Sequence, residues 1–167
     1  MADMDWQGVA RALRDLHHAL LDRARREYEE QNGVIASPAE FLQRLTGEPF
    51  FAWLRELSEM MVDIDIIREA APREMATLAG TARRAIEHLL APAAAGAPAS
   101  LFAQHYWRFV HDDPHIAMAH AAVRQALSGW PAVGEGDAAS MLHERHRLAE
   151  RARHLKTPPV KTPPTRQ

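Results

Sequence analysis

Residues 5–31 read DWQGVARALRDLHHALLDRARREYEEQ, and this stretch decides the fold class. Its apolar side chains recur at spacings of three and four residues, which places them on one stripe of an α-helix. The stripe consists of Trp6, Val9, Leu13, Leu16, Leu20 and Ala24. Asn32 and Gly33 follow, and glycine readily takes the left-handed conformation that ends a helix. The stretch therefore predicts a long amphipathic helix that buries one face.

The rest of the chain repeats helix start and stop signals, and strand-forming patterns are nearly absent. Ser37, Pro38 and Glu40 form a capping box that predicts the start of a short helix, which Gly47 ends. Further helices are predicted over about 49–69, 72–89, 100–112, 114–129 and 137–155, with a proline- and glycine-rich linker at 91–98. The sequence thus predicts an all-α fold, a single-domain helical bundle of about six or seven helices.

Composition limits the class of protein. The chain has 167 residues, of which 47% are hydrophobic and 25% are charged, and it contains no cysteine. Its length is that of one domain, and the lack of cysteine excludes a disulfide scaffold and cysteine-ligated metal sites. No stretch approaches the roughly 20 apolar residues of a membrane span, and the acidic N-terminus lacks the apolar run of a signal peptide. We therefore expect a cytoplasmic protein that does not contact membranes.

Charge is distributed unevenly along the chain. Residues 1–70 carry 14 acidic and 8 basic side chains, whereas residues 71–167 carry 8 acidic and 12 basic ones. We expect a helical domain over 1–155 and a flexible, basic, proline-rich tail over 156–167, which repeats Lys-Thr-Pro-Pro. The basic side chains of the last helix and tail are predicted to bind an acidic partner or, as an alternative, nucleic acid. They are Arg145, Arg147, Arg151, Arg153, Lys156 and Lys161.

The helix predicted over 49–69 is apolar on most of its sides. Beside its main apolar face it carries a second strip, formed by Phe51, Val62 and Ile66. A helix of this kind lies at the centre of a fold or in an oligomer interface. We therefore expect this second strip to be covered by another helix or by a partner subunit. The strip expected to face solvent consists of Ala52, Glu56, Glu59 and Asp63.

Three of the ten histidines border predicted apolar stripes on three different helices, namely His17, His105 and His120. Imidazole is a good ligand for zinc, nickel and iron, so their convergence would make a metal site. The simpler alternative is that each histidine lies at the edge of the core, with one ring nitrogen in water or hydrogen-bonded to the backbone.

Acidic residues suggest structural roles rather than chemistry. Asp65 has Arg68 three residues later, a spacing that favours an ion pair on one helix face. Glu27 falls in the last turns of the first helix, where a frayed and solvated position is the expected one. The chain also has no glycine-rich phosphate loop, no Gly-x-Ser-x-Gly elbow and no HExxH motif.

One segment resembles a pattern found in small uncharacterised helical proteins of bacteria. It runs from Ser37-Pro38 through FAWLRELS at residues 51–58 to VDID at residues 62–65. The resemblance covers about the first 70 residues and implies no activity.

The sequence as a whole favours a non-enzymatic module for protein–protein interaction or regulation, which forms a homo-oligomer and needs no cofactor. Two alternatives stay open. One is a helical bundle that binds zinc, iron or a small ligand through the core-edge histidines, and the other is association with nucleic acid through the basic C-terminal helix.

Overall fold

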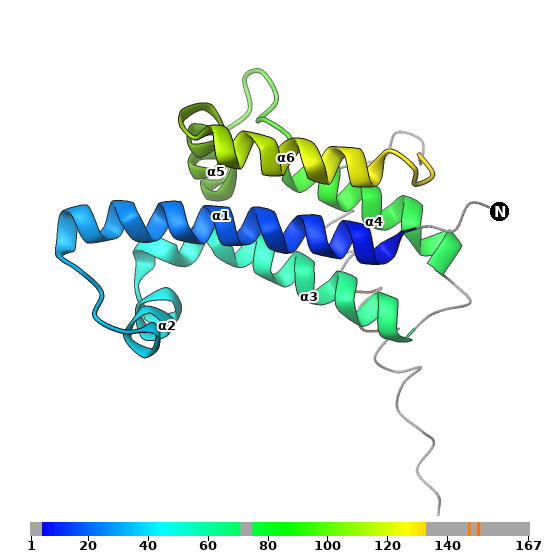
Figure 1. Cartoon of the computed structure of the whole chain (residues 1–167). Coiled ribbons are helices and arrows are strands. Elements are labelled where there is room, and N and C mark those ends of the chain that lie inside the picture. Colours follow the sequence, from blue (N-terminus) through cyan, green and yellow to red (C-terminus); the bar gives the residue numbers. More distant parts are fainter. Residues whose placement is uncertain (1–4, 71–74, 133–146, 148–149, 151–167) are drawn as a thin grey trace, which may run out of the picture.

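A computed structural model describes residues 5–70 and 75–132, together with residues 147 and 150 (Figure 1). Within these ranges the chain forms α-helices and one 3₁₀-helix, and no strand. The elements are α1 (Trp6–Asn32), α2 (Pro38–Gly47), η1 (Pro49–Leu54), α3 (Arg55–Ala70), α4 (Met75–Leu89), α5 (Leu101–Asp112) and α6 (Pro114–Leu127). The predicted all-α fold is confirmed. The helix predicted over 137–155 and the tail over 156–167 lie outside these continuous ranges.

The helix boundaries follow the capping signals of the sequence. The Ser37 hydroxyl accepts a hydrogen bond from the backbone N–H of Glu40 at 3.1 Å, and Ser100 caps α5 in the same manner. Asp113 ends α5 and caps α6, and Pro114 occupies the first turn of α6. Each side chain satisfies a backbone N–H that has no partner inside its helix, so these caps fix where the helices begin.

α1 is the central element, and α3 and α6 run antiparallel to it on either side (Figure 1). α4 packs on α3, whereas α5 contacts η1 and α6 at the end of the molecule where α1 finishes. The largest fully buried side chains come from α1, η1, α3 and α5. They are Leu13, Leu16, Leu20, Phe51, Leu54, Leu57, Met60, Ile64, Ile67, Phe102, Tyr106 and Phe109. The apolar stripe predicted on α1 is therefore buried along the centre of the core.

The helix predicted from Pro49 begins instead as the 3₁₀-helix η1 and becomes α-helical at Arg55. Three residues per turn place Phe51 and Leu54 on the same side, and both are buried. The Phe51 ring packs against the rings of Tyr28, Phe41 and Phe50. Phe51 is thus buried by helices of its own chain.

The solvent-facing strip expected on α3 is wrong at one position. Asp63 is buried, with only 4% of its surface exposed. It lies between α3 and α4, beside Thr81 and Ala85. The small side chains of α4 allow that helix to approach closely, so it covers a face of α3 that the sequence pattern of α3 alone assigns to water.

The beginning and end of the described bundle meet through two tryptophans. The ring centroids of Trp6 and Trp130 are 4.4 Å apart, and both side chains are buried. Arg83 of α4 donates a hydrogen bond to the backbone carbonyl of Trp130. None of the described helices is both long enough and apolar enough to cross a lipid bilayer.

Candidate functional site

His17 of α1 faces α3, where its Nε2 lies 3.0 Å from the hydroxyl oxygen of Ser58. The Ser58 hydroxyl itself donates to the backbone carbonyl of Leu54 at 3.2 Å, so the imidazole must be the donor in the histidine–serine pair. An activated nucleophile needs the opposite arrangement, with serine donating to the base. Burial, and to a smaller degree the neighbouring His18, lowers the pKa of His17. This pair therefore joins two helices.

His105 of α5 stacks on the indole of Trp53, with ring centroids 5.1 Å apart and an interplanar angle of 14°. Beside it, Arg108 donates two hydrogen bonds to the carboxylate of Glu27, at 3.0 and 2.9 Å. The expectation that Glu27 is frayed and solvated is wrong, because its side chain is only 15% exposed and holds α5 against α1. It also pairs with Arg23 at 3.4 Å.

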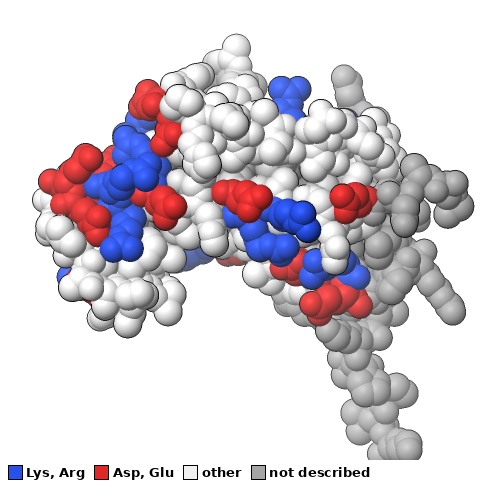
Figure 2. Space-filling view, in the orientation of Figure 1, with Lys and Arg blue, Asp and Glu red and all other residues white. Residues whose placement is uncertain are grey.

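Figure 2 shows that charged side chains of both signs gather where α1 ends beside α5. Arg26 and Asp113 add a further ion pair there, at 3.4 Å. The ion pair predicted between Asp65 and Arg68 is confirmed on α3, where the two side chains lie 3.3 Å apart. Arg14 of α1 contacts the same carboxylate at 3.7 Å.

The predicted metal site does not form among the described residues. His17, His105 and His120 face three different neighbours, and nowhere in the described ranges do three or more His, Asp or Glu side chains stand where they could hold a metal ion. The position of each histidine along its helix correctly predicted that it lies at the edge of the core. That position does not tell whether the three helices bring the histidines together.

His120 of α6 has a different surrounding from the other two. Its Nδ1 lies 2.5 Å from the hydroxyl of Tyr106, which is fully buried on α5. Burial raises the pKa of Tyr106 far above its usual value, and burial together with Arg124 lowers the pKa of His120, so both groups are neutral. Within the described residues Nδ1 is the one hydrogen-bond partner of the Tyr106 hydroxyl, so the phenol is assigned as the donor and Nδ1 as the acceptor. It follows that the proton of the imidazole is on Nε2.

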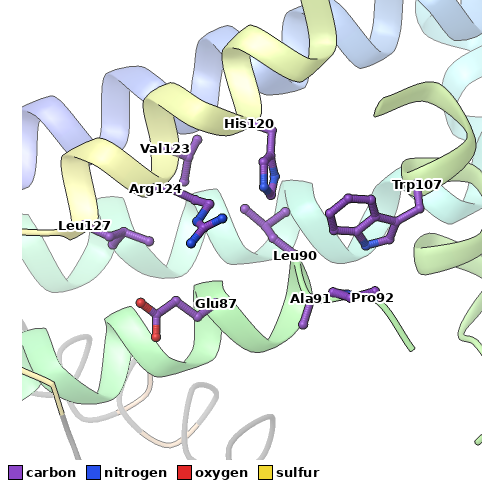
Figure 3. A pocket seen from close by; sticks show the side chains of 9 residues that line it. All are labelled: Glu87, Leu90, Ala91, Pro92, Trp107, His120, Val123, Arg124 and Leu127. Carbon is purple, nitrogen blue, oxygen red and sulfur yellow. The ribbon is translucent and has the colours of Figure 1, made fainter. Parts of the chain in front are cut away.

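The His120 side chain projects into a hollow between α4, α5 and α6 (Figure 3). The hollow has a volume of about 360 Å³. Its walls are mostly apolar, with Leu90, Ala91 and Pro92 from the segment directly after α4 and Trp107 from α5. Val123 and Leu127 of α6 complete the apolar lining.

Two charged side chains border this hollow from opposite helices. Arg124 follows His120 by one turn on α6, and Glu87 lies across from it on α4 (Figure 3). Glu87 is already paired with Arg83 at 2.7 Å. Beyond Arg124 and Glu87 a second, more polar hollow of about 410 Å³ continues between α4 and α6, toward Gln125 and Ser128. The indole N–H of Trp107 is buried and has no hydrogen-bond partner among the described residues.

Of these lining residues, only His120 was a candidate from the sequence. A signal for Arg124 existed in its spacing of four residues from His120, which places both on one helix face. Glu87, Leu90 and Trp107 carried no such signal, because their contribution depends on how α4 and α5 stand relative to α6.

The predicted partner-binding residues are scattered. Val62 is 53% exposed and Ile66 half-buried on α3, whereas Phe51 is in the core, so the three do not form one surface. Arg147 is exposed. The other five basic residues, Arg145, Arg151, Arg153, Lys156 and Lys161, lie outside the described residues, and their binding to an acidic partner or to nucleic acid stays a prediction.

Comparisons with models of protein families, with curated proteins and with solved structures give no match to this chain. The candidate site therefore rests on its own geometry.

Proposed function

We propose that this protein binds a small, partly apolar molecule in the hollow between α4, α5 and α6. The observation that carries this proposal is the hollow itself, about 360 Å³ with apolar walls and a few polar groups along one side. Ligand sites in proteins have this composition, and they are commonly found between the helices of bundles. The proposal corresponds to the small-ligand alternative of the sequence, with His120 as the histidine involved.

The walls are rigid enough to supply a preformed site. Val123, Leu127 and Leu90 are all buried residues of the core. His120 is held by its hydrogen bond to Tyr106, and the Trp107 ring packs edge-on against the rings of Tyr106 and His120. Side chains that are already fixed lose little entropy when a ligand arrives, which favours affinity.

Thermal denaturation with a panel of small aromatic and aliphatic compounds tests this function. A compound that binds only the folded state raises the melting temperature, and the increase continues to grow with the logarithm of its concentration above the Kd. Ala91→Phe is expected to abolish the effect by filling the hollow. Ala94→Phe is the matched control, because Ala94 is exposed in the same linker and does not line the hollow. Stabilisation that persists in Ala91→Phe, or a panel without any binder, contradicts the proposal.

A second candidate is the interaction module expected from the sequence, with α3 as the surface for a second copy of the chain. Its specific support is Val62, which is 53% exposed although it is β-branched and apolar. Met61 and Ile66 next to it are half-buried. Val62 and Ile66 are the members of the predicted second strip that are not in the core, and Met61 of the main face lies beside Val62 in the sequence.

Val62→Asp separates this candidate from the first. Since Val62 is half exposed in the single chain, the charge should leave folding nearly unchanged, within about 0.5 kcal/mol. It should dissociate an oligomer that uses α3, which light scattering detects as a lower mass. Met118→Asp on α6, at a residue 72% exposed, is the control and should leave the mass unaltered. A wild-type protein that is already monomeric at high concentration rules out this second candidate.

A further inference from the structure

We propose that the ligand of this hollow is an apolar monocarboxylic acid, whose carboxylate is held by the Arg124 guanidinium and the His120 imidazole N–H. The apolar body of the acid would lie against Leu90, Trp107 and Val123. This inference rests on the proposed ligand-binding function and adds the chemical class of the ligand.

The first support is the direction of the His120 hydrogen bond. Nδ1 of His120 is the one hydrogen-bond partner of the Tyr106 hydroxyl within the described residues, and a buried phenol without an acceptor is unfavourable. Nδ1 is therefore occupied as an acceptor, and the ring offers Nε2–H as a donor. The imidazole side chain projects from α6 into the hollow (Figure 3). A ligand at this point must present an acceptor.

The second support is the placement of Arg124. It follows His120 by four residues on α6, so the two side chains are neighbours on the same helix face. Arg124 forms no ion pair within the described part of the chain, and its side chain lines the same hollow as His120 (Figure 3). A guanidinium beside a neutral N–H donor is a suitable pair for the two oxygens of a carboxylate.

The third support is the balance of charge around the hollow. Glu87 is the acidic residue of the lining, and its charge is offset by Arg83 at 2.7 Å. Arg124 is left as the uncompensated charge of the lining, so the hollow favours an anion. Donors outnumber acceptors here, which disfavours an amine as the ligand.

Three compounds with one apolar body and different head groups test the inference. They are 2-naphthoate, 2-naphthylmethanol and 2-naphthylmethylamine, and their binding to the full chain is measured by isothermal titration calorimetry. The carboxylate is expected to bind about tenfold or more tightly than the alcohol, because a hydrogen bond to a charged group contributes roughly 1.5–3 kcal/mol. The amine should bind most weakly.

Substitutions assign the preference to the predicted residue. Arg124→Gln should weaken 2-naphthoate about tenfold or more and leave 2-naphthylmethanol unaffected, while Arg124→Lys should retain part of the preference. Arg55→Gln is the matched control, since Arg55 is exposed on α3 and away from the hollow.

The possible results separate the preference for a carboxylate from the proposed binding of a small molecule in the hollow. If the alcohol binds as well as the carboxylate and Ala91→Phe blocks both, the hollow is a ligand site and the carboxylate preference is wrong. An unchanged affinity of Arg124→Gln for 2-naphthoate would also show that the carboxylate preference is wrong. If none of the three compounds binds, both the preference for a carboxylate and this use of the hollow are wrong.

Discussion

Single histidine side chains determine how this fold responds to acid. Burial is the main reason why the pKa values of His17, His105 and His120 lie below the ordinary value of 6.5. Each ring is neutral and engaged in the folded state, whereas the unfolded chain takes up protons as soon as the pH falls through 6.5. The stabilisation is therefore complete above this pH and is lost as the pH falls below it toward the folded-state pKa values.

We predict that the urea midpoint of unfolding decreases between about pH 7.5 and about pH 5.5, on both sides of the ordinary histidine pKa. His17→Gln should reduce this decrease, because the glutamine amide nitrogen takes the place of Nε2, can still donate to Ser58 and does not titrate. The same change at the exposed His115 is the control. A pH dependence that is identical in wild type and His17→Gln would show that His17 is not a source of it.

Residue-scale predictions from sequence succeeded where the partner is near in the chain. The Asp65–Arg68 pair is three residues apart and forms as expected. The predictions that Glu27 and Asp63 face solvent were wrong because the residues that cover them are far along the chain, in α5 and α4. Most residues that line the hollow could not be predicted for the same reason, because they come from segments far apart in the sequence. His120 alone was named from the sequence.

At the scale of helices, α2 and α5 both begin with a serine cap but differ in how deeply they are buried. α2 has no buried residue, and its Leu42 is 61% exposed. α5 contributes Phe102 and Tyr106 to the core. A cap of equal strength should therefore have a local effect on α2 and a global effect on α5.

Two serine substitutions test this difference. Ser100→Ala is expected to cost about 1 kcal/mol of the free energy of unfolding of the whole domain, and Ser37→Ala should mainly loosen α2. Hydrogen exchange measures both effects, because amides of α2 should exchange faster in Ser37→Ala while those of α1 keep their protection. Equal losses of global stability in the two variants would contradict the peripheral role of α2.

The start of each of these helices was predictable because a cap is a local motif. The 3₁₀ turn of η1 was not, since Pro49 is an equally good first residue for an α-helix. The 3₁₀ geometry directs Phe51 and Trp53 into contacts with α1, α2 and α5. Those contacts come from packing between elements and leave no periodic signal in the segment itself.

At the scale of the whole molecule, the contact between Trp6 and Trp130 closes the bundle. α1 and the turn after α6 meet there, and the carbonyl of Trp130 is held by Arg83 of α4. We predict that Trp130→Ala lowers the free energy of unfolding by about 3–5 kcal/mol, the usual cost of removing a buried tryptophan. Met118→Ala, at an exposed site on α6, should cost little. Urea denaturation checks both, and a small loss in Trp130→Ala would mean that the pair is dispensable for closure.

The same pair gives the protein an optical signature. Two indole rings whose centroids are 4.4 Å apart and whose planes are tilted by 47° lie close enough for their electronic transitions to couple. Coupled transitions produce paired circular-dichroism bands of opposite sign, superimposed on the helical spectrum. Replacing either tryptophan by phenylalanine should remove the paired bands. Their intensity in the intact chain then reports, without any added label, whether α1 and the end of α6 are together.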